Sequence, residues 1–148
     1  MLNDSIGIEP KYTEFIEKVA ASKQVWGLMS KAGWANSHSA EDEETTVVPF
    51  WSDRSLAKAS ARDDWKSFTP TEIPLTDFLE SWCLGMAEDG TLVGINWDAK
   101  MQGEESESLE VALDILNRLH AIGSAIKFKN YGSINDFIDE VSEEEEED

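Results

Sequence analysis

Basic residues are scarce in this sequence. It has 12 Lys and Arg against 31 Asp and Glu, a formal net charge of −19 at pH 7. Residues 143–148 are all acidic, and a second acidic run comprises Glu41, Asp42, Glu43 and Glu44. Without these ten residues the remaining chain still carries −9. Nucleic acids and anionic membranes are bound by clustered Lys and Arg. We therefore expect no nucleic acid and no membrane as a partner, and we expect any charged partner to be a basic protein.

Cysteines and long apolar segments are also rare. Cys83 is the single cysteine, so no internal disulfide can form, and its apolar neighbours indicate a buried thiol. No apolar run approaches the roughly 18 residues that a membrane-spanning helix needs. The N-terminal residues lack the basic and apolar regions of a secretion signal. These absences predict a cytoplasmic protein. No feature of the sequence specifies an oligomeric state.

Motifs for catalysis, metal binding and cofactor binding are missing. The two histidines, His38 and His120, belong to no H-x-x-x-H or E-x-x-H spacing, so we expect no metal site. Neither G-x-G-x-x-G nor a phosphate-binding loop occurs, and we expect no cofactor. Ser52 follows an apolar stretch but lacks the G-x-S-x-G context of a serine nucleophile. We therefore assign no catalytic residue.

Hydrophobic periodicity predicts one α+β domain. Six Trp and six Phe supply bulky side chains for a single core. Periods of 3.6 and 2 predict helices in 10–23, 56–65, 76–90 and 108–122 and strands in 25–30, 45–51, 71–75 and 91–98, with a turn or further strand near 33–34. We expect a mixed or antiparallel sheet of four to five strands packed by helices. Residues 99–108 read as a polar connector, and 41–44 as a solvated hairpin loop.

The C-terminal part is expected to be helical and then disordered. A short helix is predicted in 132–141, with Ser133 and Asp136 spaced as a cap. The glutamates that follow repel one another and have nothing apolar to bury. This divides the chain into a domain of residues 1–141 and a disordered acidic tail of residues 142–148.

Local features refine three of these elements. Pro49 lacks a backbone donor, which favours an edge position, a bulge or the end of its strand. Ser52 or Asp53 is expected to cap the following helix, because such side chains accept hydrogen bonds from free amides of the first turn. Trp82 holds the central place on the apolar face of the 76–90 helix and is expected to be largely buried.

Two tryptophans are candidates for a binding face. Trp34 is flanked by Gly33 and Asn36, and Trp97 lies between Asn96 and Asp98, so both rings are placed near strand ends beside polar groups. Aromatic side chains in that setting often line binding surfaces. The alternative, which we favour for both rings, is packing under the C-terminal helix. With Asp98 and the acidic run 41–44, these rings make up the predicted binding residues.

Several stretches resemble a known family. They are VWGLMSKAGWA, VPFWSDRSLA, IPLTDFLESWCLGMAEDGTLVGINWD and the following MQG. Together, over roughly residues 12–103, they are similar to short bacterial proteins grouped as domain of unknown function 2750. The resemblance implies a small α+β protein and brings no catalytic residue with it. VPFWSDRSLA alone also resembles the strand, turn and helix of the enhanced-serine-sensitivity proteins, a regulatory group.

These features favour a non-enzymatic interaction or regulatory protein, of immunity or adaptor type, that binds a basic partner. The alternative is a small hydrolase or transferase with a strand-end site formed by Ser52, Asp53, Arg54 and Asp98. A third reading, mimicry of DNA charge, requires carboxylates that are spaced like phosphates and not merely numerous.

Overall fold

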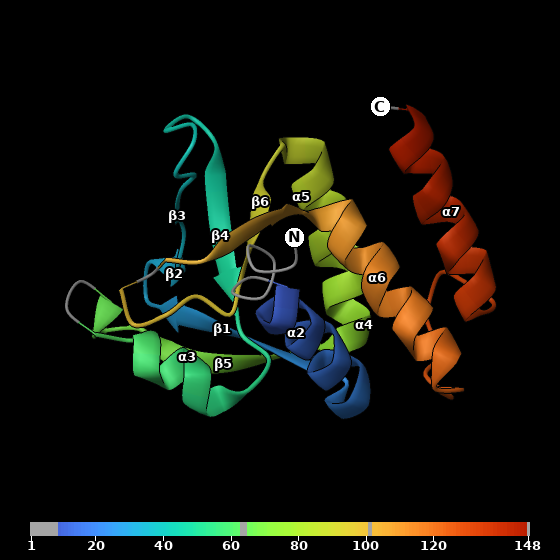
Figure 1. Cartoon of the computed structure of the whole chain (residues 1–148), viewed down its shortest axis with the longest axis horizontal. Helices are drawn as coiled ribbons and strands as arrows, with labels where there is room; N and C mark the ends of the chain where they lie inside the picture. Colours follow the sequence, from blue (N-terminus) through green and yellow to red (C-terminus); the bar gives the residue numbers. More distant parts are fainter. Residues whose placement is uncertain (1–8, 63–64, 101, 148) are drawn as a thin grey trace.

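Two β-sheets joined at one bridge form the centre of the protein (Figure 1). The structure, a computed structural model, describes residues 9–62, 65–100 and 102–147. The first sheet has the order β2-β1-β5 and is antiparallel. The second has the order β3-β4-β6-β7, with β4 and β6 parallel and the other pairs antiparallel. The strands are β1 (Gln24–Ser30), β2 (Gly33–Trp34), β3 (Ser37–His38), β4 (Thr46–Phe50), β5 (Thr69–Pro74), β6 (Leu92–Ile95) and β7 (Glu104–Glu107).

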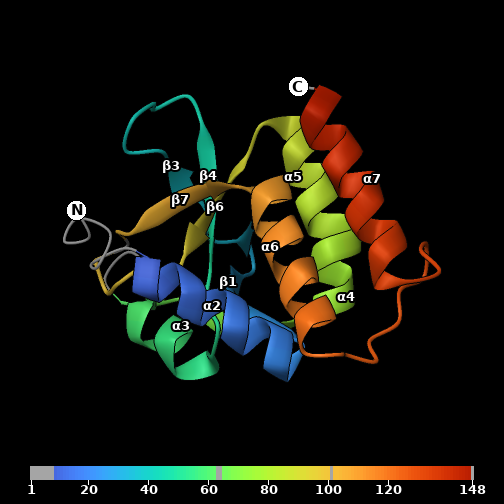
Figure 2. The same cartoon turned by 45° about the vertical axis from the view of Figure 1, so that its right-hand side comes forward.

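Helices cover both faces of this arrangement (Figures 1 and 2). They are α2 (Glu9–Ser22), α3 (Arg54–Ser60), α4 (Leu75–Asp77), the π-helical segment η2 (Phe78–Cys83), α5 (Leu84–Asp89), α6 (Ser108–Ala121) and α7 (Ile134–Glu147). The α+β class and the mixed strand pairing are confirmed. The strands, however, form sheets of three and four instead of one sheet of four to five. Trp26 and Trp51 join the two sheets by exchanging backbone hydrogen bonds of 2.9 and 2.8 Å.

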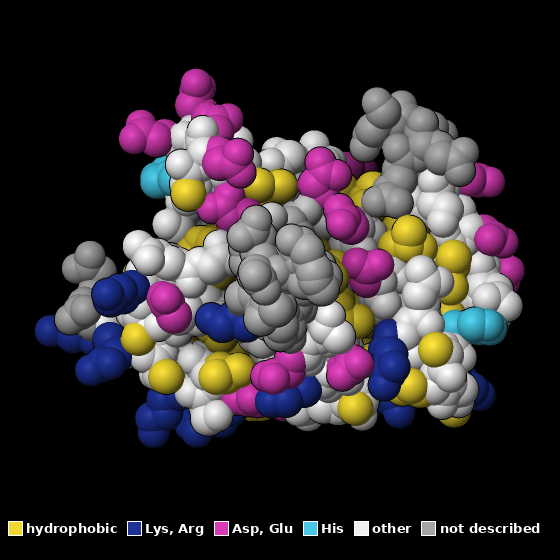
Figure 3. Space-filling model, viewed as in Figure 1, with side chains coloured by type: hydrophobic (Ala, Val, Ile, Leu, Met, Phe, Trp, Pro, Cys, Tyr) yellow, Lys and Arg dark blue, Asp and Glu magenta, His cyan; other side chains and the backbone are white. Residues whose placement is uncertain are grey.

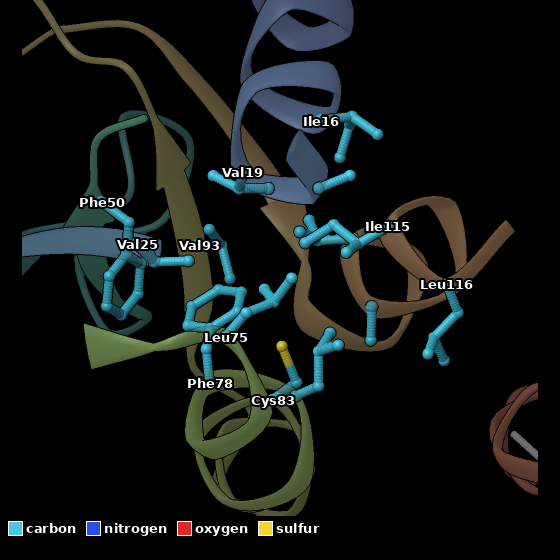
Figure 4. Packing of buried hydrophobic residues seen from close by; sticks show 14 of the residues in the cluster. Ile16, Val19, Val25, Phe50, Leu75, Phe78, Cys83, Val93, Ile115 and Leu116 are labelled. Atoms are coloured by element: carbon cyan, nitrogen blue, oxygen red, sulfur yellow. The ribbon is translucent and has the colours of Figure 1, made fainter. Parts of the chain in front are cut away.

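The larger core lies between the second sheet and the helices α2, α4–α5 and α6. Figure 4 shows Val19 of α2, Phe78 of η2 and Ile115 of α6 converging on Val93 of β6. Cys83 is fully buried in this core, as expected, and burial raises the pKa of its thiol above the usual range. A smaller core under α3 contains Leu28, Ala35, Val47, Trp51, Ala57 and Trp97. The sheets are therefore covered on both faces.

The structure decides which of the two candidate residues, Ser52 or Asp53, caps α3. Asp53 is the N-cap, and its carboxylate accepts a hydrogen bond of 3.0 Å from the backbone N–H of Leu56. Burial acts to raise the pKa of Asp53, but hydrogen bonds from Ser55 and Leu56 and the ammonium of Lys18 outweigh it and lower that pKa. Ser52 is not the cap. The helix also ends at Ser60, short of residue 65, because the chain turns there with a bond from Arg62 N to Ser60 O.

Pro49 lies at a gap in the strand pairing. On the side of β4 away from β6, β3 pairs with Thr46 and Val47, and Trp26 of β1 pairs with Trp51. Pro49 falls between these two partners, where a missing N–H breaks no ladder. β4 is thus an internal strand that tolerates proline because its second neighbour changes at this point.

Strand β7 was missed by the sequence analysis, which assigned its residues to a polar connector. Glu104–Glu107 pairs with β6 at the edge of the second sheet, and the register joins Val93 to Ser106. The first three residues of β7 are half-buried and the last is exposed. An edge strand of this kind is held by backbone hydrogen bonds, so hydrophobic alternation gives no signal for it.

The acidic tail continues a helix. Phe137 and Val141 of α7 are buried against the rest of the fold, and Ser133 caps the helix through a hydrogen bond of 3.0 Å from Asp136 N. Residues 142–147, which we expected to be disordered, extend α7, and Asp148 lies outside the described residues. Glutamate is a good helix former, so a helix already anchored by apolar residues can continue through the run. Within the described residues, no helix is long and apolar enough to cross a membrane.

Candidate functional site

A surface hollow of about 620 Å³ lies between β4 and α5. We call it the β4–α5 groove. Val48 of β4 and Met86 of α5 contribute apolar surface to this open hollow, and Trp82 contributes an aromatic ring. Thr46 and Asp89 are among its polar lining residues. The groove therefore combines apolar surface with hydrogen-bonding and acidic groups, as ligand sites commonly do.

Trp82 connects the groove to the core. Its ring makes edge-to-face contacts with Trp34 at 5.0 Å and with Phe50 at 5.4 Å, measured between ring centroids. Phe50 is fully buried, whereas Trp82 is half-buried, so our expectation of a largely buried Trp82 is corrected. Phe78, Leu79 and Cys83 of the same π-helical segment are fully buried, whereas Trp82 lies at the border of the core. One part of the Trp82 ring is left available in the groove.

The π-helical segment is itself a notable feature of the groove. It spans Phe78–Cys83 and contributes Ser81 and Trp82 to the groove. The hydroxyl of Ser108, at the start of α6, donates a hydrogen bond of 2.7 Å to the carbonyl oxygen of Cys83. This bond satisfies a carbonyl at the end of the segment. Short π-helical segments inside α-helices are frequent at functional sites.

The segments that build the groove contain no basic residue. The lining residues fall within residues 36–48, which have four Asp and Glu, and residues 81–91, which have two, and neither segment has a Lys or Arg. Figure 3 shows acidic side chains gathered over the β3–β4 hairpin. In Figures 1 and 2 this hairpin and the end of α5 point toward the same end of the molecule. The formal charge of the lining segments is therefore negative, which favours positively charged ligands.

The acidic hairpin loop is held in place by a residue that sequence reasoning missed. The carboxylate of Glu105, on β7, accepts hydrogen bonds from Ser39 Oγ at 2.5 Å and Ala40 N at 2.8 Å. Within the loop, a hydrogen bond from the backbone N–H of Glu44, with another from the Thr45 hydroxyl, lowers the pKa of Asp42. All four acids of residues 41–44 are exposed, as expected for a solvated hairpin loop. Their carboxylates are thus presented on an ordered turn.

The structure separates the remaining predicted binding residues. Trp34 is half-buried and contacts Trp82 of the groove. Trp97 is only 4% exposed, and its indole N–H donates a hydrogen bond of 3.0 Å to Glu104 O. The side chain of Asp98 closes a turn by accepting hydrogen bonds from Lys100 N and Gln102 N. Trp97 is therefore buried, but in the smaller core and not under the C-terminal helix as our favoured alternative held. Asp98 does not line the groove.

The strand-end residues of the enzymatic alternative are occupied by local interactions. Ser52 is 3% exposed; its N–H donates to Asn96 Oδ1 at 2.9 Å, and its hydroxyl oxygen accepts from Asn96 Nδ2 at 3.1 Å. Asp53 caps α3, Arg54 is exposed, and Asp98 binds its own turn. Asn96 links the ends of the parallel strands β4 and β6 from a left-handed backbone conformation with φ of 42°. These bonds give Ser52 a structural role.

Comparisons with known proteins identify a family but no characterised relative. The model of the family described as protein of unknown function (DUF2750) matches residues 12–115, and the chain belongs to this family. No curated protein matches the chain, and no solved structure matches it. The family match ends within α6, so α7 and the acidic tail of residues 142–148 lie beyond it. The similarity to the enhanced-serine-sensitivity proteins is supported by none of these comparisons.

Proposed function

We propose that this protein is a non-enzymatic interaction protein and that the β4–α5 groove binds a basic segment of a protein partner. The observation that carries the proposal is the coincidence of apolar lining residues, Val48 and Met86, with lining segments 36–48 and 81–91 that have six acids and no Lys or Arg. An immunity-type or adaptor role in the bacterial cytoplasm is the biological setting that we infer for such binding.

The groove suits Lys and Arg side chains in particular. Their aliphatic stems cover apolar surface while the charged end reaches solvent or a carboxylate. The half-buried ring of Trp82 offers a face for a cation–π contact, and Asp89 at the end of α5 offers an acceptor. The exposed carboxylates of residues 41–44 extend the negative charge beyond the groove, which accelerates encounter with a basic partner.

The proposal is tested with a matched pair of variants. Asp89 lines the groove, whereas its neighbour Glu88 is exposed on the same helix and does not. A basic protein is first captured from native extract at low salt, and its association with the purified protein is then measured. Asp89→Asn should weaken binding several-fold, and Glu88→Gln should change it much less. Equal effects of the two variants would place the interface elsewhere.

Salt and charge changes test the electrostatic part. Raising the salt from about 0.05 to about 0.5 M should slow association more than it speeds dissociation, because screening acts mainly before contact. Converting Glu41, Asp42, Glu43 and Glu44 to their amides should reproduce part of this effect, and Ser52→Ala should leave association unchanged. Salt-independent association would contradict the proposal. Loss of binding in Ser52→Ala with the fold intact would favour the strand-end alternative.

A further inference from the structure

A second hollow, of about 340 Å³, has Trp34 among its lining residues. It is lined by Ala32, Gly33, Trp34, Asn36, Trp65 and Phe68, and we call it the aromatic hollow. Its volume is within the range of sites for small molecules. Three of its six lining residues are aromatic, so a flat, unsaturated ligand would find stacking partners here.

The rings of the aromatic hollow are held in position before any ligand binds. The ring centroids of Trp65 and Phe68 lie 5.1 Å apart, and both side chains pack against the smaller core. The turn that carries them is closed by hydrogen bonds from Trp65 N to Arg62 O at 2.8 Å and from Phe68 N to Trp65 O at 3.0 Å. The six-membered ring of Trp34 lies directly over Gly27, where the lack of a side chain leaves room for it. Rings fixed in this way lose little entropy on binding.

Cations neighbour several lining residues of the aromatic hollow in the sequence, and Asp63 and Asp64, between Arg62 and Trp65, lie outside the described residues. Lys31 precedes the lining residue Ala32, Lys66 follows Trp65, and Arg62 belongs to the same turn; all three are exposed. Figure 3 shows Lys and Arg side chains gathered around α3 and the turn after it. Residues 1–40 and 45–75 together have eight Lys and Arg and eight Asp and Glu, and therefore no net charge. The negative charge of the chain comes from elsewhere.

We propose that the aromatic hollow binds a nucleoside phosphate. The base stacks on Trp65 and Trp34, and the phosphate meets the cations Lys31, Arg62 and Lys66. A purely apolar ligand would not use the cations, and a bare anion would not use the rings. The hollow adjoins the β4–α5 groove, with which it shares the lining residue Asn36, but its rings and the neighbouring cations are not part of the groove, so the proposal does not depend on the function proposed there. A long nucleic acid strand is disfavoured, because its further phosphates would meet a chain of net charge −19.

Calorimetric titration of the full chain with AMP and GMP tests the proposal, with adenosine and inorganic phosphate as partial ligands. Both nucleotides should bind, and adenosine and phosphate should each bind at least several-fold more weakly. Trp65→Leu should weaken AMP binding roughly tenfold or more, as expected for lost base stacking. Trp65→Phe keeps a ring and should retain most of the affinity, which separates loss of stacking from loss of the fold.

Charge variants and a longer ligand complete the test. The double variant Lys31→Gln, Lys66→Gln should weaken AMP binding roughly three- to tenfold, and the control Lys58→Gln, exposed on α3, should not. Asp89→Asn in the groove should leave AMP binding unchanged. No heat of binding with either nucleotide at about 1 mM would overturn the proposal. Tighter binding of a single-stranded oligonucleotide than of AMP would overturn the assignment to a free nucleotide.

Discussion

Replacing Asn96 by alanine should lower the free energy of unfolding by about 2–5 kcal/mol. Asn96 is 6% exposed and accepts a 2.9 Å hydrogen bond from the backbone N–H of Ser52. Without the amide this buried N–H has no partner, which costs about 1–3 kcal/mol. Asn96 also has φ of 42°, and alanine in this left-handed region costs about 1–2 kcal/mol. The two contributions add to the predicted loss.

Two further variants separate these contributions. Asn96→Gly loses the same hydrogen bonds but tolerates the left-handed backbone, so it should be less destabilising than Asn96→Ala by about 1 kcal/mol. Ser52→Ala removes only the hydroxyl that accepts the 3.1 Å bond from Asn96 Nδ2, and should cost about 1 kcal/mol. In the double variant Ser52→Ala, Asn96→Ala the costs should not add, because the two side chains share one interaction.

Urea unfolding, followed by far-ultraviolet circular dichroism and tryptophan fluorescence, measures these differences. The slope of the free energy with urea should stay unchanged, since the surface exposed on unfolding is almost the same. If Asn96→Ala leaves the free energy of unfolding nearly unchanged, the hydrogen bonds between Asn96 and Ser52 do not stabilise the fold. If Asn96→Gly is as destabilising as Asn96→Ala, the backbone argument is wrong.

Three other predictions test packing, the tail and pH dependence. Gly27→Ala places a Cβ 2.9 Å from the Trp34 ring. It should lower the free energy of unfolding in urea by about 1–3 kcal/mol and change the fluorescence of Trp34. An unchanged stability would mean that the Trp34 ring moves freely. Deleting residues 142–148 should hardly change the melting temperature, and a loss of several degrees would show that the tail stabilises the fold. Phe137→Ala, at a buried site of the same helix, should instead lower the free energy of unfolding by about 3–5 kcal/mol. Because the pKa of Asp53 is lowered in the folded protein, its ionised carboxylate stabilises the fold above about pH 3.9, the ordinary pKa of an aspartate. This stabilisation is lost as the pH falls through the pKa of Asp53 in the folded protein. Acid titration of Asp53→Asn should therefore show a smaller loss of stability below about pH 5 than the wild type, and identical curves would contradict the argument.

Much of the fold follows from local patterns in the sequence. The apolar spacing of α2 and α6, the strand β1 and the acidic hairpin loop were predicted correctly. The cap of α3 was predicted at Ser52 or Asp53, and the structure places it at Asp53. Each depends on residues close in the chain, whose side chains repeat with the period of a helix or strand or bind the adjacent backbone. The excess of acid, and the expectation of a basic partner that follows from it, also came from the sequence.

The candidate sites were decided by tertiary structure. Trp34 and Trp97 have similar polar neighbours in the sequence, yet Trp34 is half-buried and Trp97 is only 4% exposed. The difference depends on which strand each follows and on what packs above the ring, and no local pattern contains that information. The hydrogen bond between Ser52 and Asn96 joins residues 44 positions apart in the sequence, and the hydrogen bond between Ser39 and Glu105 joins residues 66 positions apart. Such pairs exist only after the strands have found their order, because hydrogen bonds over these separations require the whole sheet to fix their geometry.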